Sequence, residues 1–393
     1  MTAIPETFSY AAYLECVHCK TAYSITDINT YASCCNQPLV VKYDHPAGFY
    51  KEDLIFREKN MWRYFEVLPV MERKNIVSLG EGMTALLPLE KSAAVHGFAD
   101  LMMKDESSNP TGSFKARGLS AAVSKAKELG ITRCIVPTAG NAGGALAAYC
   151  ARAGIACTVV MPRHTPAVFK QECELYGANL ILVDGLINDC AKKVAELKQS
   201  GNYYDVSTLK EPYRLEGKKT MGYEIAEQLN WQLPDVIIYP AGGGTGLIGI
   251  WKAFKELINM GWIDEQPLPK MIAVQSRQCA PVVRAFYNPD DWMQGFAPQP
   301  SIANGLAVPY PFGMDMMQQV LQESNGMAYA VSEEEIIAGV KEFARTEGMI
   351  IAPETAAVWK ALLHLRKMKV VDAADKIVLM NTGSGYKYLE NLF

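Results

Sequence analysis

The sequence predicts an α/β fold in which a mostly parallel sheet is covered by helices on both faces. From about residue 98 onward, short apolar segments alternate with longer segments of helical pattern. This alternation is typical of β–α–β units. The chain has 393 residues, which is enough for two or more domains. Small polar residues follow three of the apolar segments, at strand ends where an open α/β sheet binds its ligands.

A first series of units is expected between residues 133 and 207. Its apolar, β-branched segments predict strands at 133–140, 155–162, 178–185 and 202–207. The intervening segments are rich in small residues or amphipathic, and they predict helices at 141–154, 165–177 and 186–201. Gly177 is placed to end the second of these helices.

A second series of units is expected in the C-terminal half. Apolar runs predict strands at 234–241, 270–276 and 376–383. Helical spacing predicts helices at 245–261 and 332–348. Ser332 and Glu335 have the spacing of a capping box, which favours a helix that begins after Ser332.

Composition excludes several classes of protein. The net charge of −4, from 38 basic and 42 acidic residues, does not indicate a nucleic-acid binder. No apolar run is long enough to span a bilayer, and the N-terminus lacks a signal-peptide pattern, so we expect no membrane association. Ten cysteines in a chain of this length do not indicate a disulfide framework, and we expect mostly buried free thiols in a reducing cytoplasm.

A glycine-rich loop joins the predicted strand at 234–241 to the predicted helix at 245–261. It consists of Gly242, Gly243, Gly244, Thr245 and Gly246. Glycines let the backbone approach a ligand closely, and a helix N-terminus offers N–H groups and partial positive charge. No Gly-Lys-Ser/Thr follows, so this is not a nucleotide P-loop. The loop predicts a cradle for a single phosphate monoester, with a plain tight turn as the alternative.

A lysine stands at the expected start of another helix, in the stretch "SSNPTGSFKARG" at 107–118. Lys115 follows Phe114 there, and Arg117 lies two residues further on. A helix N-terminus disfavours a cation, so this position favours an anionic partner or a covalent role for the amine. Partial burial would disfavour the ammonium form and make the amine a better nucleophile. A Schiff-base lysine together with a phosphate cradle indicates pyridoxal phosphate, and a solvated surface lysine is the alternative.

Two further polar residues end predicted strands. Asn141 in "PTAGNAGG" either caps a helix or donates to a cofactor oxygen, while nearby loop N–H groups would bind a substrate carboxylate. Thr382 in "MNTGSG" either forms a local turn or brings its hydroxyl to a pyridine nitrogen.

These motifs, in this order, resemble those of the fold-type-II, or tryptophan-synthase-β-like, superfamily of pyridoxal-phosphate enzymes. "NPTGSFKARG" resembles its Schiff-base motif, "TAGNAGGALAAYCARAG" its Ser-Gly-Asn segment and "GGGTG" its phosphate loop. "LGEGMTALLPL" and "EGMIIAPETAA" resemble two further blocks. "PYRLEGKKTMGYEIAEQL" is similar to a block that favours the threonine synthases over the dehydratases. The resemblance covers nearly the whole chain.

The resemblance implies two doubly wound parallel-sheet domains with the cofactor in the cleft between them. A large domain is expected at 51–120 and 212–393, a smaller one at 121–211, and a zinc-ribbon-like segment at 1–50. The resemblance also implies a homodimer that acts on a small amino acid and binds no nucleic acid.

The resemblance also assigns roles to residues. Lys115 is implied as the catalytic lysine that holds pyridoxal phosphate. The other implied cofactor contacts are Phe114, Asn141, Gly242, Gly243, Gly244, Thr245, Gly246 and Thr382. The implied substrate contacts are Thr138, Gly140, Asn141, Arg214 and Lys218.

The implied reaction converts O-phospho-L-homoserine and water to L-threonine and phosphate. Two positions depart from the family pattern: Ala116 replaces an aspartate, and Glu211 stands before Pro212, where a carboxylate would repel a phosphate. Other reactions on the same scaffold therefore stay open, namely those of a threonine or serine dehydratase or a cysteate synthase. A binding protein without catalysis is disfavoured by the intact Lys115.

The N-terminal cysteines resemble the zinc-ribbon lead-in of some threonine synthases. The candidate ligands are Cys16, Cys19, Cys34 and Cys35. The family form has two Cys-x-x-Cys pairs, but the second pair is broken here because Ala32 replaces its first cysteine. His18 or His45 would be alternative ligands, and a ribbon that packs without metal is the other reading.

Overall fold

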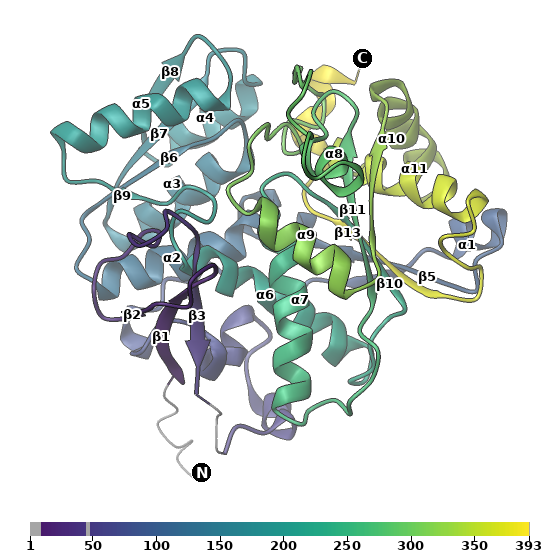
Figure 1. The fold of residues 1–393 in the computed structure, drawn as a ribbon, viewed down its shortest axis with the longest axis horizontal. Coiled ribbons are helices and arrows are strands. Elements are labelled where there is room, and N and C mark those ends of the chain that lie inside the picture. The colour runs from purple at the N-terminus through teal and green to yellow at the C-terminus, as the bar shows by residue number, and fades with distance from the viewer. Residues whose placement is uncertain (1–8, 45–47, 393) are drawn as a thin grey trace. The chain divides into compact units, whose positions relative to one another are not determined.

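The structure of the protein, a computed structural model, describes residues 9–44 and 48–392 (Figure 1). The described chain divides into two compact units. Unit 1 contains the described residues up to Met83, together with Lys115–Met221 and Lys255–Trp262. Unit 2 contains Thr84–Phe114, Gly222–Phe254 and the described residues from Ile263 onward.

Unit 1 holds two sheets. The N-terminal sheet is antiparallel, has the order β2-β1-β3, and is formed by β1 (Ala11–Cys16), β2 (Ala22–Ser24) and β3 (Leu39–Tyr43). The second sheet has the order β8-β7-β6-β9 with every pair parallel, and its strands are β6 (Arg133–Pro137), β7 (Ala156–Pro162), β8 (Asn179–Val183) and β9 (Tyr204–Asp205). The strand expected at 202–207 is therefore reduced to two residues.

Helices cover both faces of the parallel sheet in unit 1. Val160 of β7 packs in one cluster with Cys190 and Val194 of α5 (Ile187–Ser200). A Cβ added at Gly143 of α3 (Asn141–Ala153) would lie 2.8 Å from Met161, the next residue of β7. Because successive side chains of a strand point to opposite faces, α5 and α3 lie on opposite sides of the sheet.

Unit 2 is built on a six-stranded sheet with the order β12-β11-β10-β13-β5-β4. All neighbours are parallel except β4, which runs antiparallel to β5 at the edge. The strands are β4 (Leu86–Pro88), β5 (Asp100–Asp105), β10 (Val236–Pro240), β11 (Lys270–Ser276), β12 (Met327–Val331) and β13 (Lys376–Asn381). The predicted α/β fold with parallel sheets is thus confirmed.

The helices predicted at 141–154, 165–177, 186–201, 245–261 and 332–348 are all present, with each end within two residues of the prediction. The α-helices are α1 (Glu90–His96), α2 (Lys115–Glu128), α3 (Asn141–Ala153), α4 (Ala167–Leu175), α5 (Ile187–Ser200), α6 (Tyr213–Gln228), α7 (Thr245–Asn259), α8 (Pro281–Tyr287), α9 (Met314–Glu323), α10 (Glu333–Glu347) and α11 (Pro353–Lys367). The 3-10 helices are η1 (Lys51–Phe56), η2 (Met61–Val67), η3 (Arg73–Asn75), η4 (Glu106–Ser108), η5 (Pro110–Gly112) and η6 (Gly385–Asn391). The capping box of Ser332 and Glu335 is present at the start of α10, as predicted.

A large hydrophobic cluster lies in unit 2. It joins apolar side chains of β5, β10, β11 and β13 to one face of α11, where Trp359 is almost fully buried. Burial on this scale fixes the sheet, because apolar surface removed from water stabilises the fold by about 25 cal/mol per Å². The loops after the strand ends therefore stand on a rigid base. Among the described residues, no helix combines the length and hydrophobicity that crossing a membrane requires.

Candidate active site

Lys115 is the first residue of α2, and the loop before it is held in place by the end of β13. The backbone N–H of Phe114 donates to the carbonyl of Thr382 at 3.1 Å, and that of Ser384 donates to the carbonyl of Gly112 at 2.9 Å. These contacts within unit 2 bring the predicted cofactor residues Phe114 and Thr382 together.

The loop before Lys115 carries backbone strain and an unpaired hydroxyl. Thr111 has a φ of 62°, which a β-branched residue rarely adopts. Its carbonyl accepts a hydrogen bond from the Lys387 ammonium at 2.7 Å. The Ser113 side chain is fully buried, and its hydroxyl has no hydrogen-bond partner among the described residues. A buried hydroxyl without a partner is costly, so Ser113 is a candidate ligand contact that the sequence did not single out.

Three glycines of the loop, Gly242, Gly244 and Gly246, leave too little room for a side chain. A Cβ at Gly242 would lie 2.1 Å from the carbonyl oxygen of Gly305, and one at Gly244 would lie 2.2 Å from the sulfur of Met317. Gly244 also has a φ of 79°, which L-residues seldom adopt. Its carbonyl accepts from the N–H of Ile248, so the first-turn N–H groups of α7 have no acceptor within the helix.

A buried tyrosine lies beside this loop. Tyr239 of β10 is 2% exposed, and its hydroxyl has no partner among the described residues. A Cβ at Gly246 would lie 1.8 Å from that hydroxyl, so only glycine fits there. A polar tip in an otherwise aliphatic strand is the signal that could have identified Tyr239. The bare backbone and the unpaired hydroxyl fit a phosphate monoester.

The loop that opens α3 belongs to unit 1. Thr138 is almost fully buried, and its hydroxyl accepts the N–H of Gly140 at 3.1 Å. Gly140 stands in the N-cap position and offers no side chain, so α3 begins at Asn141 without a side-chain cap. The first turn of α3 therefore presents backbone N–H groups, as a carboxylate site requires.

The first two turns of α6 carry the predicted substrate residues Arg214 and Lys218. Both side chains are buried, with exposed fractions of 1% and 0%. Nη1 of Arg214 donates to the carbonyl of Val206, whereas its Nε and Nη2 have no partner among the described residues. Burial lowers the pKa of Lys218 well below its usual range, and the charges of Lys115 and Arg214 lower it further.

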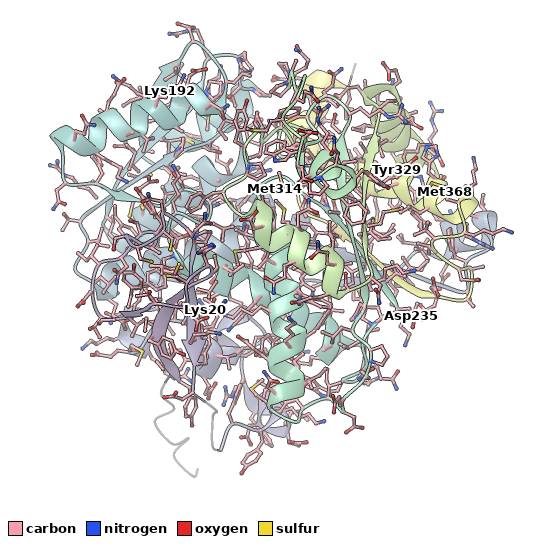
Figure 2. All side chains as sticks on the ribbon, in the orientation of Figure 1. Lys20, Lys192, Asp235, Met314, Tyr329 and Met368 are labelled. Atoms are coloured by element: carbon pink, nitrogen blue, oxygen red, sulfur yellow. The ribbon has the colours of Figure 1, made fainter. Side chains whose placement is uncertain are left out.

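Two glycines allow α6 to approach α2. A Cβ at Gly217 would lie 2.1 Å from the carbonyl oxygen of Arg117, and one at Gly118 would lie 2.9 Å from that of Arg214. Arg117 is buried in this contact, where it donates to the hydroxyl of Thr220 at 3.0 Å. By contrast, Lys192 on the outer surface of α5 keeps a solvated side chain that is 76% exposed (Figure 2). The buried cations on α6 therefore differ from ordinary surface lysines and arginines.

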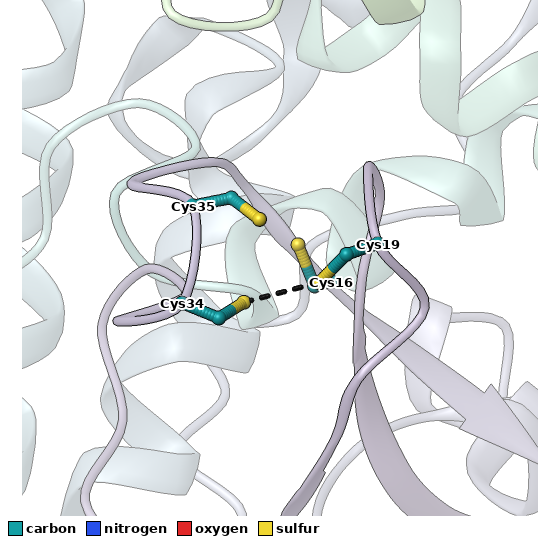
Figure 3. A group of neighbouring side chains, drawn as sticks. All are labelled: Cys16, Cys19, Cys34 and Cys35. Atoms are coloured by element: carbon teal, nitrogen blue, oxygen red, sulfur yellow. Dashed lines mark hydrogen bonds between the residues drawn. The ribbon is translucent and has the colours of Figure 1, made fainter.

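The four N-terminal cysteines converge on one point (Figure 3). The sulfur atoms of Cys16, Cys19, Cys34 and Cys35 all lie within 4.8 Å of one another, and those of Cys19 and Cys34 are 3.2 Å apart. Hydrogen bonds from Thr21, with smaller contributions from Cys34 and Cys35, lower the pKa of Cys19 to about 6. His45 lies outside the described residues. Adjacent cysteines at 34 and 35 therefore do not prevent all four sulfurs from meeting.

The family model for pyridoxal-phosphate dependent enzymes matches residues 77–383. The chain belongs to this family. It is 36% identical to the threonine synthase of Methanocaldococcus jannaschii over 377 residues, which cover 95% of this chain and 92% of that protein. It is 33% identical to the threonine synthase of Methanosarcina acetivorans over 373 residues, covering 94% and 91% of the two chains.

Solved structures agree on the fold of this pyridoxal-phosphate dependent enzyme. A hydrogen sulfide-producing enzyme from Fusobacterium nucleatum superposes with a TM-score of 0.63 at 24% identity, covering 80% of this chain and 98% of that one. O-ureido-L-serine synthase superposes with a TM-score of 0.65 at 20% identity, covering 78% and 90%. At these identities the likeness establishes the fold alone.

Proposed function

We propose that this enzyme converts O-phospho-L-homoserine and water to L-threonine and phosphate. One observation in the structure carries the proposal: Arg214 is buried with two of its donor nitrogens unpartnered among the described residues, next to Lys218 on the same helix face. A guanidinium in this state fits a phosphate ester. The glycine loop fits a second phosphate, that of the cofactor. The proposed reaction needs both phosphate sites, one for the cofactor and one for the substrate. The similarity to threonine synthases supports the same assignment.

The chain's residues fit pyridoxal phosphate. Gly242–Gly246 would hold its phosphate, Lys115 its aldehyde, and Asn141 and Thr382 its ring oxygen and ring nitrogen. Phe114, whose N–H donates to the carbonyl of Thr382, would lie against the ring. When bound, pyridoxal phosphate withdraws electrons from the substrate and makes its Cα proton removable.

The remaining steps belong to the side chains. With the cofactor bound, the amine of Lys115 would act as the general base that removes the proton from Cα of the substrate. The first-turn N–H groups of α3, next to Thr138 and Gly140, bind the substrate carboxylate. Arg214 and Lys218 would hold the phosphate while a second proton leaves Cβ and the phosphate departs from Cγ with the electrons of the C–O bond. Cγ would then take up a proton, and water would add its hydroxyl at Cβ.

Product analysis on the purified holoenzyme tests the assignment. We expect O-phospho-L-homoserine to yield equal amounts of threonine and inorganic phosphate. O-phospho-L-serine, L-serine and L-threonine serve as competing substrates, because Lys115 and the glycine loop would serve their elimination or replacement reactions equally well. Turnover of one of these instead of O-phospho-L-homoserine would assign the enzyme to a dehydratase or a cysteate synthase.

We also propose that Cys16, Cys19, Cys34 and Cys35 bind a structural zinc ion. A zinc ion with four thiolates at about 2.3 Å requires sulfur atoms about 3.8 Å apart, and the observed cluster within 4.8 Å is close to that arrangement. Metal analysis of the purified protein should find about one zinc per chain. Cys34→Ser should lose it, whereas Cys157→Ser, outside the cluster, should retain it. The homodimer and the cytoplasmic location stay predictions, and light scattering of the holoenzyme tests the former.

A further inference from the structure

Glu211 binds the start of α6 from within the chain. Its carboxylate accepts the backbone N–H of Tyr213 at 2.8 Å and that of Arg214 at 3.1 Å and 3.2 Å. The side chain is fully buried. These N–H groups are the ones that a helix offers to a bound anion. The anion position at the start of α6 is therefore filled by Glu211 itself, and a substrate phosphate must bind elsewhere on α6.

Arg214 supplies that other position. Its backbone N–H is bonded to Glu211, but its side chain extends to the carbonyl of Val206 through Nη1 alone. Nε and Nη2 are buried without acceptors among the described residues. Two buried donors on one edge of a guanidinium match two oxygens of a phosphate or sulfate group.

The groups around Glu211 decide its charge. The positive charges of Arg214 and Lys218, both on α6, act to lower the pKa of Glu211. The other titratable groups that act on Glu211, Arg214 or Lys218 are Tyr213 on α6, Tyr204 and Asp205 on β9, and Lys115 on α2. Burial outweighs these cations and raises the pKa of Glu211 to about 7.

We propose that Glu211 must take up a proton from solvent when the doubly charged phosphate of the substrate binds Arg214. This inference rests on the proposed function for the identity of the substrate. A bound dianion next to Arg214 places a second negative charge near the buried carboxylate, and the protonated form of Glu211 removes that repulsion. Glu211 keeps its bonds to the α6 backbone in either form through an unprotonated oxygen.

Sulfate is a suitable probe because it stays doubly charged over the whole working range of pH, whereas phosphate esters titrate within it. The holoenzyme is used, so that the cofactor's phosphate occupies the glycine loop. Calorimetry gives the sulfate dissociation constant from pH 6 to pH 8. Titrations in buffers of different ionisation enthalpy give the protons taken up.

We expect the ratio of the wild-type to the Glu211→Gln dissociation constant for sulfate to rise about tenfold between pH 6 and pH 8, one factor of ten for each pH unit above the pKa of Glu211. At pH 8 the wild type should take up about one proton more per sulfate than Glu211→Gln. Glutamine retains an oxygen for the α6 N–H groups, so the variant keeps the cap. Glu335→Gln, which alters the carboxylate in the capping box of α10, should follow the wild type.

Arg214→Gln locates the site, because it should abolish sulfate binding to the holoenzyme. The inference is overturned by parallel pH curves for the wild type and Glu211→Gln, by sulfate binding without proton uptake, or by unchanged sulfate binding in Arg214→Gln. Proton uptake is measured on the wild type, so the inference stays testable if a variant fails to fold. Sulfate binding requires no turnover, and a failure to form threonine therefore counts against the proposed function alone.

Discussion

The N-termini of α7 and α6 differ in what meets their backbone N–H groups. Before α7, three consecutive glycines leave the backbone bare, and no charged side chain stands among residues 242–246. Before α6, Glu211 fills the N–H groups and a buried arginine follows at once. A phosphate can bind the glycine loop without displacing a charged side chain. The loop therefore suits a cofactor phosphate that stays bound. Because Glu211 already fills the N–H groups at the α6 start, a substrate phosphate that arrives and leaves in every cycle would bind the side chain of Arg214 instead.

The two helix starts also differ in what a substitution removes. At α7 the binding groups belong to the backbone, so a side chain can only obstruct them. At α6 they are side chains, so each can be removed singly. Lys115 is proposed to act on both phosphate-bearing ligands, because it would hold the aldehyde of the cofactor and remove a proton from the substrate. Its loss should therefore have the largest effect.

Lys115→Ala should reduce threonine formation by about 10²–10⁴-fold, the range for loss of a general base, and should remove the visible absorbance of lysine-bound cofactor. Steady-state assays and absorption spectra measure the two effects. Lys125→Ala, on the same helix, is the matched control for the spectrum, because Lys125 pairs with Glu128 instead. A Lys115→Ala enzyme with unchanged absorbance would refute the assignment of this lysine.

Arg214→Gln should raise the KM for O-phospho-L-homoserine by about tenfold to a hundredfold, since a charged hydrogen-bonding partner contributes about 1.5–3 kcal/mol. The cofactor spectrum should be unchanged, because the glycine loop is intact. Arg163→Gln alters an exposed arginine that pairs with Asp184, and its KM should stay at the wild-type value. Equal KM values in the two variants would remove Arg214 from the substrate site.

The contrast between the two helix starts marks what the sequence could and could not predict. The glycine loop was predictable because its signal is local: glycines, a preceding apolar strand and a following helix. The role of Glu211 was not, because its position beside Pro212 indicates only a carboxylate near a phosphate. Its bonds to Tyr213 and Arg214 depend on where α6 begins. The same reason applies to Tyr239, whose hydroxyl meets Gly246 only after β10 and α7 have packed.

Regular elements were predicted better than contacts. The helix at 141–154 and the capping box at Ser332 follow from spacing within one turn. The strand at 202–207 was overestimated, because only Tyr204 and Asp205 pair with β6. The roles of the other site residues stay predictions, because chemical experiments are needed to test them. The domain boundaries also stay predictions.

Gly244→Ala should destabilise the protein by about 1–3 kcal/mol, as overpacking does, and should weaken the binding of pyridoxal phosphate. The methyl group would meet the Met317 sulfur at 2.2 Å. Gly261→Ala is the matched control, because Gly261 has a similar φ of 68° with nothing within 4 Å of an added Cβ. Urea unfolding and cofactor titration of both variants separate the contact from the backbone strain. Equal cofactor affinity in the two would mean that the loop does not bind the phosphate.

Glu211→Gln should change how the free energy of unfolding depends on pH. The glycine loop before α7 carries no charged side chain and should contribute no such dependence. Burial raises the pKa of Glu211 to about 7, above its ordinary value of 4.5, so the folded state holds a proton that the unfolded state has released. This contribution to stability is complete below pH 4.5 and is lost as the pH rises to about 7. Between pH 5.5 and 6.5 the wild type should therefore lose about 1.2 kcal/mol relative to Glu211→Gln. Urea unfolding of both holoenzymes at the two pH values measures this difference, and an unchanged difference would mean that Glu211 is ionised throughout.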